Sequence, residues 1–159
     1  MNTSTETAAP KPPATGQGIR LELTREFSHS RERLFTALTT PAAILRWFGP
    51  PGVTNLDAQV DLRVGGRYRF TVKGMNDGPI FYVAGQYLEI IPPELLRFTW
   101  QWEHCDAAEP EMTVSFHLAS TPTGCRLTLV QTGFSSQEDC DRHTHGWTGS
   151  LDRLSQFGD

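Results

Sequence analysis

Residues 53–134 constrain the fold most, because apolar and polar side chains alternate along most of this stretch with a period of two. Alternation of this kind is typical of antiparallel strands that bury one face and leave the other in water. Clusters of glycine, proline, asparagine and threonine interrupt the alternation at short intervals, as expected of hairpin turns. We therefore predict six strands, over residues 53–62, 67–73, 80–91, 95–104, 112–118 and 126–134.

A further strand is predicted ahead of this stretch, where Ile19, Leu21, Leu23 and Phe27 alternate with polar residues. Arg25 breaks the pattern, because its parity places it on the apolar face. A charge on that face needs a partner, since an unpaired buried charge is costly. Arg25 is therefore predicted either to form an ion pair or to act as a polar anchor for a ligand.

Two short helices are predicted directly after this first strand, over residues 30–39 and 40–48. Each has apolar residues on one face. Ser30 is the expected N-cap of the first helix and Thr40 that of the second, which has a proline in its first turn. The cluster Gly49–Gly52 is expected to end the second helix.

The last predicted element is a long helix that begins after Ser135 or Ser136, either of which suits its N-cap. Glycines at 146 and 149 weaken this helix by up to about 1 kcal/mol each relative to alanine. Such glycines allow a close approach to the sheet or leave room for another molecule. The helix has an apolar stripe at helical spacing, formed by Cys140, Trp147, Leu151 and Leu154.

Together these segments predict an α+β domain with a curved, seven-stranded antiparallel sheet and a long C-terminal helix over an apolar cavity. Only the last helix is long enough to cover the dry face of the sheet. A chain of 159 residues suits one domain. Residues 1–18 are rich in Thr, Pro, Ala and Gly and are predicted to be a disordered tail. The expected domain is therefore 19–159.

Composition narrows the classes of function. The formal net charge is −4 and no long basic stripe occurs, so nucleic acid is not an expected partner. No apolar segment is long enough to span a membrane, and no secretory signal is apparent. Three cysteines without a C-x-x-C pair give no disulfide framework. We expect a cytoplasmic protein with reduced thiols.

Several blocks of the sequence, taken in order, resemble the heat-shock-protein-90 ATPase activator-like family of the START-like (SRPBCC) superfamily. The chain differs from the family pattern at His29-Ser30, where the family often has Ala-Pro. The resemblance implies the helix-grip fold, also called START-like or Bet v-like, with an apolar ligand cavity under the C-terminal helix. The matching blocks are Thr24–Phe27, Arg33–Pro41, Arg46–Pro50, Asp61–Tyr68, Gly85–Ile90 with Pro92-Pro93, Phe98–Trp100, Thr128–Phe134, His143 with Gly146-Trp147, and Leu151–Leu154.

The expected cavity predicts binding of a hydrophobic small molecule without covalent chemistry. One helix cannot fill the hollow of a strongly curved sheet, and the remaining space would be apolar with few polar points, as in most ligand pockets. Large aromatic rings on the inward face suit an apolar or aromatic guest. The candidate ligand-binding residues are Trp47, Tyr68, Phe70, Phe98, Trp100, Trp102, Phe116, Gln131, Trp147 and Leu151.

A first alternative is a cyclase- or hydrolase-type enzyme that works in the same cavity. It needs an inward carboxylate or histidine, and either Gln86 or Glu89 is predicted to point inward, with the register left open. Cys140 and His143 share a helix face, but they give fewer ligands than zinc requires. His143 is therefore expected on the helix surface, and no catalytic residue, metal or cofactor is assigned.

A second alternative is a protein–protein adaptor or chaperone-ATPase activator, whose partner the sequence does not identify. Such a protein needs an exposed apolar or charged patch of several hundred Å². The apolar segment Trp47–Pro51 is the first place to look for one, because it is expected near the mouth of the cavity.

Overall fold

A computed structural model describes residues 19–103 and 111–156 of the chain. The predicted tail, residues 1–18, lies outside the described residues, and so does Cys105. The described elements follow the predicted order of one strand, two short helices, six strands and one long helix. They are β1 (Arg20–Phe27), α1 (Arg31–Thr39), α2 (Pro41–Trp47), β2 (Thr54–Val60), β3 (Arg67–Lys73), β4 (Ile80–Ile91), β5 (Leu95–Trp102), β6 (Met112–Thr121), β7 (Gly124–Thr132) and α3 (Gln137–Ser155).

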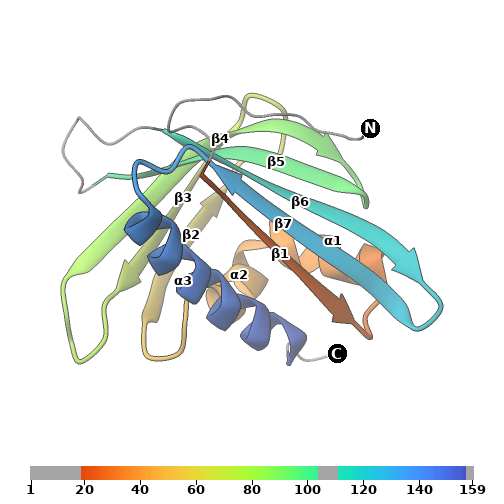
Figure 1. The fold of residues 1–159 in the computed structure, drawn as a ribbon, viewed down its shortest axis with the longest axis horizontal. Helices are drawn as coiled ribbons and strands as arrows, with labels where there is room; N and C mark the ends of the chain where they lie inside the picture. The colour runs from red at the N-terminus through yellow and green to blue at the C-terminus, as the bar shows by residue number, and fades with distance from the viewer. Residues whose placement is uncertain (1–18, 104–110, 157–159) are drawn as a thin grey trace.

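The seven strands form one antiparallel sheet in the order β1-β7-β6-β5-β4-β3-β2. Strands β2 to β7 pair with their chain neighbours, and β1 completes the sheet by pairing with β7. Figure 1 shows α3 running across one face of this sheet. Helix α2 packs against β2 and α3, and α1 packs against β6 and β7. This arrangement confirms the predicted α+β helix-grip architecture.

Local signals set the ends of two of the helices. The Ser30 hydroxyl accepts a hydrogen bond from the backbone N–H of Arg33 at 3.2 Å, which caps α1. Ser136 caps α3 in the same way through the N–H of Asp139 at 3.1 Å. Thr40 occupies the predicted N-cap position of α2, but its hydroxyl donates to the carbonyl of Thr36 at 2.7 Å and makes no cap bond to α2.

The core lies between the inward face of the sheet and the three helices. The predicted stripe of α3 is buried there, with Leu151 and Leu154 at most 1% exposed. Cys125 and Cys140 are buried free thiols. Arg25, on the inward parity of β1, forms an ion pair with Asp152 of α3 at 2.8 Å. This pair satisfies the charge that the sequence placed on an apolar face.

A β-bulge in β4 decides which way its polar residues face. The pairing of β4 with β5 shifts between Tyr87 and Glu89, so that Glu89 lies opposite Arg97 and forms an ion pair with it at 3.6 Å. The extra residue of a bulge shifts the in–out alternation of the strand by one position, so Glu89 does not follow the inward parity of Tyr87. Tyr87 is buried, whereas Glu89 is held beside Arg97.

Over the described residues, no helix combines the length and the apolarity that crossing a membrane would require.

Candidate ligand pocket

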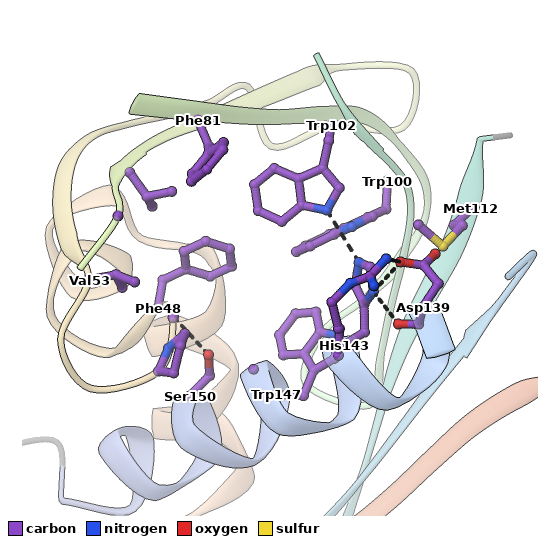
Figure 2. A pocket seen from close by; sticks show the side chains of 16 residues that line it. Phe48, Val53, Phe81, Trp100, Trp102, Met112, Asp139, His143, Trp147 and Ser150 are labelled. Atoms are coloured by element: carbon purple, nitrogen blue, oxygen red, sulfur yellow. Dashed lines mark hydrogen bonds and ion pairs between the residues drawn. The ribbon is translucent and has the colours of Figure 1, made fainter. Parts of the chain in front are cut away.

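A pocket of about 360 Å³ opens between the inward face of the sheet and the first half of α3. Figure 2 shows aromatic side chains converging on it from β5, α3 and the end of α2. Its volume falls at the lower end of the range found for small-molecule sites. The lining residues are Phe48, Gly49, Pro50, Val53, Val72, Gly74, Phe81, Trp100, Trp102, Met112, Asp139, Arg142, His143, Gly146, Trp147 and Ser150.

Five large aromatic side chains line the pocket: Phe48, Phe81, Trp100, Trp102 and Trp147. Trp100 lies edge-on to Trp102, with ring centroids 5.6 Å apart, and is tilted against Trp147 at 5.2 Å. Phe48 meets Trp147 edge-on at 6.3 Å, and Phe81 meets Trp102 in the same way at 6.3 Å. These are favourable offset and edge-to-face arrangements, so the rings hold one another in place around the pocket.

A polar strip interrupts the aromatic wall where α3 meets β5. The indole N–H of Trp102 donates to His143 Nε2 at 3.2 Å, and His143 Nδ1 lies 2.9 Å from the backbone carbonyl of Asp139. A carbonyl can only accept, so the proton of the neutral ring is placed on Nδ1 and the lone pair of Nε2 receives the Trp102 bond. Both nitrogens of His143 are therefore occupied.

The loop after α2 is fastened to α3 and forms the opposite wall. The N–H of Gly49 donates to Ser150 Oγ at 2.7 Å. Arg153 donates to the carbonyls of Phe48 and Gly49 at 3.0 and 3.1 Å. Because these bonds satisfy carbonyls at the end of α2, they also fix where the Phe48 ring enters the pocket.

The two glycines of α3 have opposite surroundings. A Cβ on Gly149 would lie 2.8 Å from the Cα of Pro50, so this glycine allows the loop to approach the helix closely. A Cβ on Gly146 would meet nothing within 4 Å, and Gly146 lines the pocket. Glycine at 146 therefore leaves space that any larger side chain would occupy.

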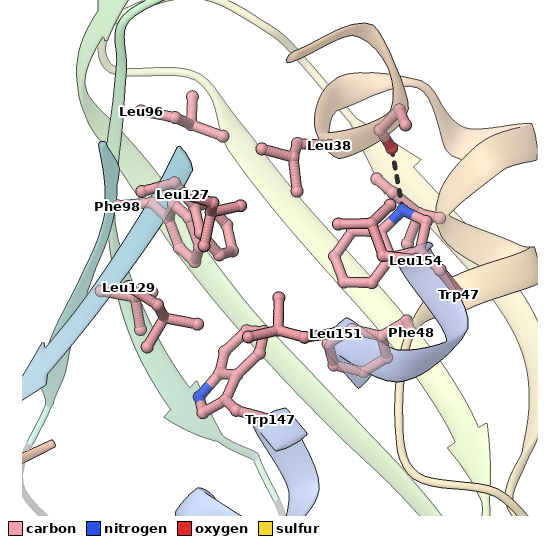
Figure 3. Close-up of a cluster of buried hydrophobic side chains, with 14 of the residues drawn as sticks. Leu38, Trp47, Phe48, Leu96, Phe98, Leu127, Leu129, Trp147, Leu151 and Leu154 are labelled. Atoms are coloured by element: carbon pink, nitrogen blue, oxygen red, sulfur yellow. Dashed lines mark hydrogen bonds between the residues drawn. The ribbon is translucent and has the colours of Figure 1, made fainter. Parts of the chain in front are cut away.

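The other end of the concave face is filled. A residual void of only about 10 Å³ remains there, between rings that include Tyr68, Phe70, Phe98 and Phe116. Figure 3 shows Phe98 there among the leucines of the core. The hydroxyl of Tyr68 donates to the carbonyl of Thr99 at 2.6 Å. Burial raises the pKa of the Tyr68 phenol well above its usual value, as does the neighbouring Tyr87. This end is a dry core.

Comparison with known proteins identifies the family. The family described as activator of Hsp90 ATPase homolog 1-like protein matches residues 28–158. The chain belongs to this family. Among proteins with curated descriptions, none matches the chain significantly.

Solved structures of AHSA1-like proteins share the fold. The AHSA1 protein SPO3351 of Silicibacter pomeroyi is 32% identical, with a TM-score of 0.76, over 87% of this chain and 96% of that one. Protein CV1439 of Chromobacterium violaceum is 28% identical, with a TM-score of 0.78, over the same shares of the two chains. CalU16 of Micromonospora echinospora, at 23% identity and a TM-score of 0.66, covers 87% of this chain and 74% of its own, and it supports the fold alone.

In this AHSA1-like chain, the predicted ligand-binding residues fall into three places. Trp100, Trp102 and Trp147 line the pocket. Gln131 and Leu151 are fully buried, and Gln131 Oε1 accepts the indole N–H of Trp147 at 2.7 Å, so it supports the wall from behind. The other predicted residues, which lie at the filled end, are Trp47, Tyr68, Phe70, Phe98 and Phe116.

Two predictions about polar groups need correction. His143, expected on the helix surface, lies in the wall of the pocket with a side chain only 10% exposed. Neither Gln86 nor Glu89 lines the pocket, because Gln86 bonds to Gly65 and the bulge keeps Glu89 beside Arg97. For Arg25 the sequence left an ion pair and a ligand anchor open; the structure has the ion pair with Asp152, and Arg25 is not among the lining residues.

The sequence placed Trp47–Pro51 near the mouth of the cavity, but it did not predict that Val53 and Phe81 line the wall, and it did not predict the polar strip. One sequence signal was present, since Gly146 lies in a helix whose apolar stripe includes Trp147, Leu151 and Leu154. Across residues 19–103 and 111–156, no three His, Cys, Asp or Glu side chains lie close enough together to hold a metal ion.

Proposed function

We propose that this AHSA1-like protein binds an apolar small molecule in the pocket and performs no covalent chemistry on it. The observation that carries the proposal is the contrast along one concave face, where about 360 Å³ stays open at one end and about 10 Å³ at the other. Protein interiors are ordinarily packed without such space. An aromatic wall with a few polar points is the usual composition of a small-molecule site.

Gly146 supports the same proposal. A glycine inside a helix costs up to about 1 kcal/mol relative to alanine, and no neighbour within 4 Å requires a glycine at this position. Space for a guest is the benefit that offsets this cost. The surrounding indoles provide the flat apolar surface that such a guest needs.

The state of His143 favours binding over acid–base catalysis. A general base needs a free lone pair within reach of the substrate. The Nε2 lone pair of His143 is directed at the indole N–H of Trp102, and Nδ1 is directed at the Asp139 carbonyl. Catalysis through His143 would first require the Trp102 bond to break.

Titration with apolar ligands, followed by amide NMR, tests the proposal. The panel includes fatty acids, sterols, flavonoids and polyketide-like aromatics. We expect saturable shifts at pocket residues, with Trp100, Gly146 and Trp147 among the largest. A well-folded sample that responds to no member of the panel would overturn the proposal and leave the partner-protein alternative.

A blocked pocket gives the matched control. Gly146→Leu places a side chain into the open space and is expected to weaken binding at least about tenfold, because the guest and the leucine compete for one volume. His145→Leu adds the same side chain at the adjacent, exposed position and should leave affinity unchanged. Equal affinities for both variants would place the ligand elsewhere on the molecule.

A further inference from the structure

Three ring systems meet at the polar strip of the pocket. The centroids of Trp100 and Trp102 are 5.6 Å apart, and those of Trp100 and His143 are 6.2 Å apart. The third pair, Trp102 and His143, is separated by 6.5 Å. Figure 2 shows all three rings grouped on one side of the pocket. Their nitrogens are the only polar atoms these three rings bring to the wall.

These three rings carry more hydrogen-bond donors than acceptors. Trp100 and Trp102 each supply one indole N–H donor, and His143 supplies one acceptor, because its Nδ1 proton faces the Asp139 carbonyl. Trp102 takes that acceptor at 3.2 Å. The Nε1 of Trp100 is buried and has no hydrogen-bond partner among residues 19–103 and 111–156.

The other two tryptophans each have a hydrogen-bond partner for the indole N–H, so the missing partner is particular to Trp100. Trp47 Nε1 donates to the Ala37 carbonyl at 2.9 Å, and Trp147 Nε1 donates to Gln131 Oε1 at 2.7 Å. Buried polar groups in proteins nearly always have a partner, and an unpaired one costs stability. Trp100 alone of the four tryptophans keeps its donor unsatisfied, and Trp100 lines the pocket.

The charges that line the pocket are already matched. The guanidinium of Arg142 lies 3.0 Å from the carboxylate of Asp139 and 3.7 Å from that of Glu138. His143 offers no free group either, because its Nε2 accepts from Trp102 and its Nδ1 lies 3.5 Å from the Asp139 carboxylate. A ligand carboxylate would therefore lose its hydration without gaining an unpaired cation among the described lining residues.

We propose that the ligand is a flat, uncharged, apolar molecule with a hydrogen-bond acceptor, such as a ring carbonyl, and that this acceptor bonds to Nε1 of Trp100. The inference rests on the proposed function and specifies its ligand. Because the Trp100 nitrogen is buried, an adjacent ring must shift to admit the acceptor. Of the two neighbouring indoles, Trp102 is the less buried, so its ring is expected to make way.

A pair of probes that differ only in the acceptor tests this assignment. Fluorenone and fluorene have the same flat tricyclic frame, and only fluorenone carries a carbonyl. We expect fluorenone to bind about five- to tenfold more tightly, the worth of one net hydrogen bond. Fluorene-9-carboxylate, which adds a charge, should bind at least about tenfold more weakly than fluorenone.

The four indole N–H resonances give a direct readout that needs no variant. Fluorenone should move the Trp100 indole signal in the direction of a stronger hydrogen bond, and fluorene should not. Trp100→Phe keeps an aromatic ring and removes the donor, so it should equalise the affinities of the two probes. Trp47→Phe, which removes a donor already bonded to Ala37, should leave their ratio unchanged.

The outcomes separate the two proposals. If neither probe nor any other apolar molecule binds, the proposed function fails together with this inference. If fluorene and fluorenone bind the pocket equally, or if the preference persists in Trp100→Phe, the pocket binds ligands but the role of Trp100 is wrong. If Trp100→Phe does not fold, the indole signals of the unaltered protein still decide, because an unmoved Trp100 signal with bound fluorenone overturns the inference.

Discussion

The two ends of the concave face are built from the same kind of side chain and have different properties. At the filled end, Phe98 contacts Tyr68, Tyr87 and Phe116, with ring centroids 5.3 to 6.1 Å apart. At the open end, equally large rings surround about 360 Å³ of space. Phe48, Trp100 and Trp147 belong to both walls and separate the two ends. Aromatic content alone therefore does not decide whether such a face becomes core or pocket.

What differs is the element that faces the rings. At the filled end, Leu151 and Leu154 of α3 and Leu38 of α1 extend into the layer of rings, as Figure 3 shows. At the open end, α3 contributes His143 and Trp147 to the wall, and Gly146 beside them extends nothing into the space. The side chains that the helices place against the sheet thus set the boundary between the packed core and the pocket.

The largest effect is expected at the filled end. Phe98→Ala should lower the free energy of unfolding by about 3–5 kcal/mol, since it leaves a cavity in a layer with almost no residual void. Phe81→Ala, on the half-buried rim of the pocket, should cost clearly less, because part of the ring is already in contact with open space. Urea unfolding of both variants measures the difference. Equal losses would contradict the distinction between the two ends.

The sequence predicts which aromatic rings face inward, but it does not predict where a pocket remains beside them. Strand parity placed Trp100, Phe98 and Phe116 on the inward face, and the structure has all three buried there. Parity gives the direction of a side chain and says nothing of how far the opposing helix stands from it. Whether an inward ring lines a void depends on the register of α3 over the sheet, which is set by tertiary contacts such as the bond from Gly49 to Ser150.

The polar strip was unpredictable for a related reason. His143 follows the helical spacing of Cys140 and Trp147, but its distance from Trp102 depends on a contact between residues 41 positions apart. The position of Glu89 depended on a bulge whose extra residue, Leu88, has no sequence signal of its own. The local sequence pattern therefore predicts the helices and strands, whereas contacts between distant residues determine which side chains line the pocket.

The close approach of α3 to the loop gives the next largest effect. Gly149→Ala would place a methyl group 2.8 Å from the backbone Cα of Pro50, so the loop or the helix must move. We expect a loss of about 1–3 kcal/mol of stability, the usual cost of overpacking. The same movement should strain the Gly49–Ser150 bond and alter amide shifts around residues 48–53. A variant as stable as the unaltered protein would mean that this contact is loose.

Alkaline pH tests whether the filled end is dry. Burial raises the pKa of Tyr68 above 10, so between pH 10 and this raised value the unfolded chain loses a proton that the folded chain keeps. The stability supplied by the neutral phenol is complete below pH 10 and is lost as pH rises through the folded pKa. The slope reaches about 1.4 kcal/mol per pH unit for one phenol. Tyr68→Phe should remove that part of the slope.

Urea unfolding at pH 9, 10 and 11 separates this effect from others. The bond from Tyr68 to the Thr99 carbonyl is lost in the variant at every pH, so it shifts the curve without changing its slope. Tyr87, whose pKa burial also raises, contributes the same trend in both proteins and cancels in the comparison. Parallel curves for the two proteins would show that water reaches the Tyr68 hydroxyl.

The smallest effect concerns Gly146 and has the opposite sign to that of Gly149. Gly146→Ala should raise the free energy of unfolding by about 0.5–1 kcal/mol, because alanine favours the helix and its Cβ meets nothing within 4 Å. The same methyl group takes up part of the pocket, so ligand affinity should fall slightly as stability rises. Thermal unfolding and ligand titration of this one variant measure both quantities. A gain in stability with a loss in binding would indicate that glycine is present for the guest, whereas a gain with unchanged binding would indicate that the guest lies away from α3.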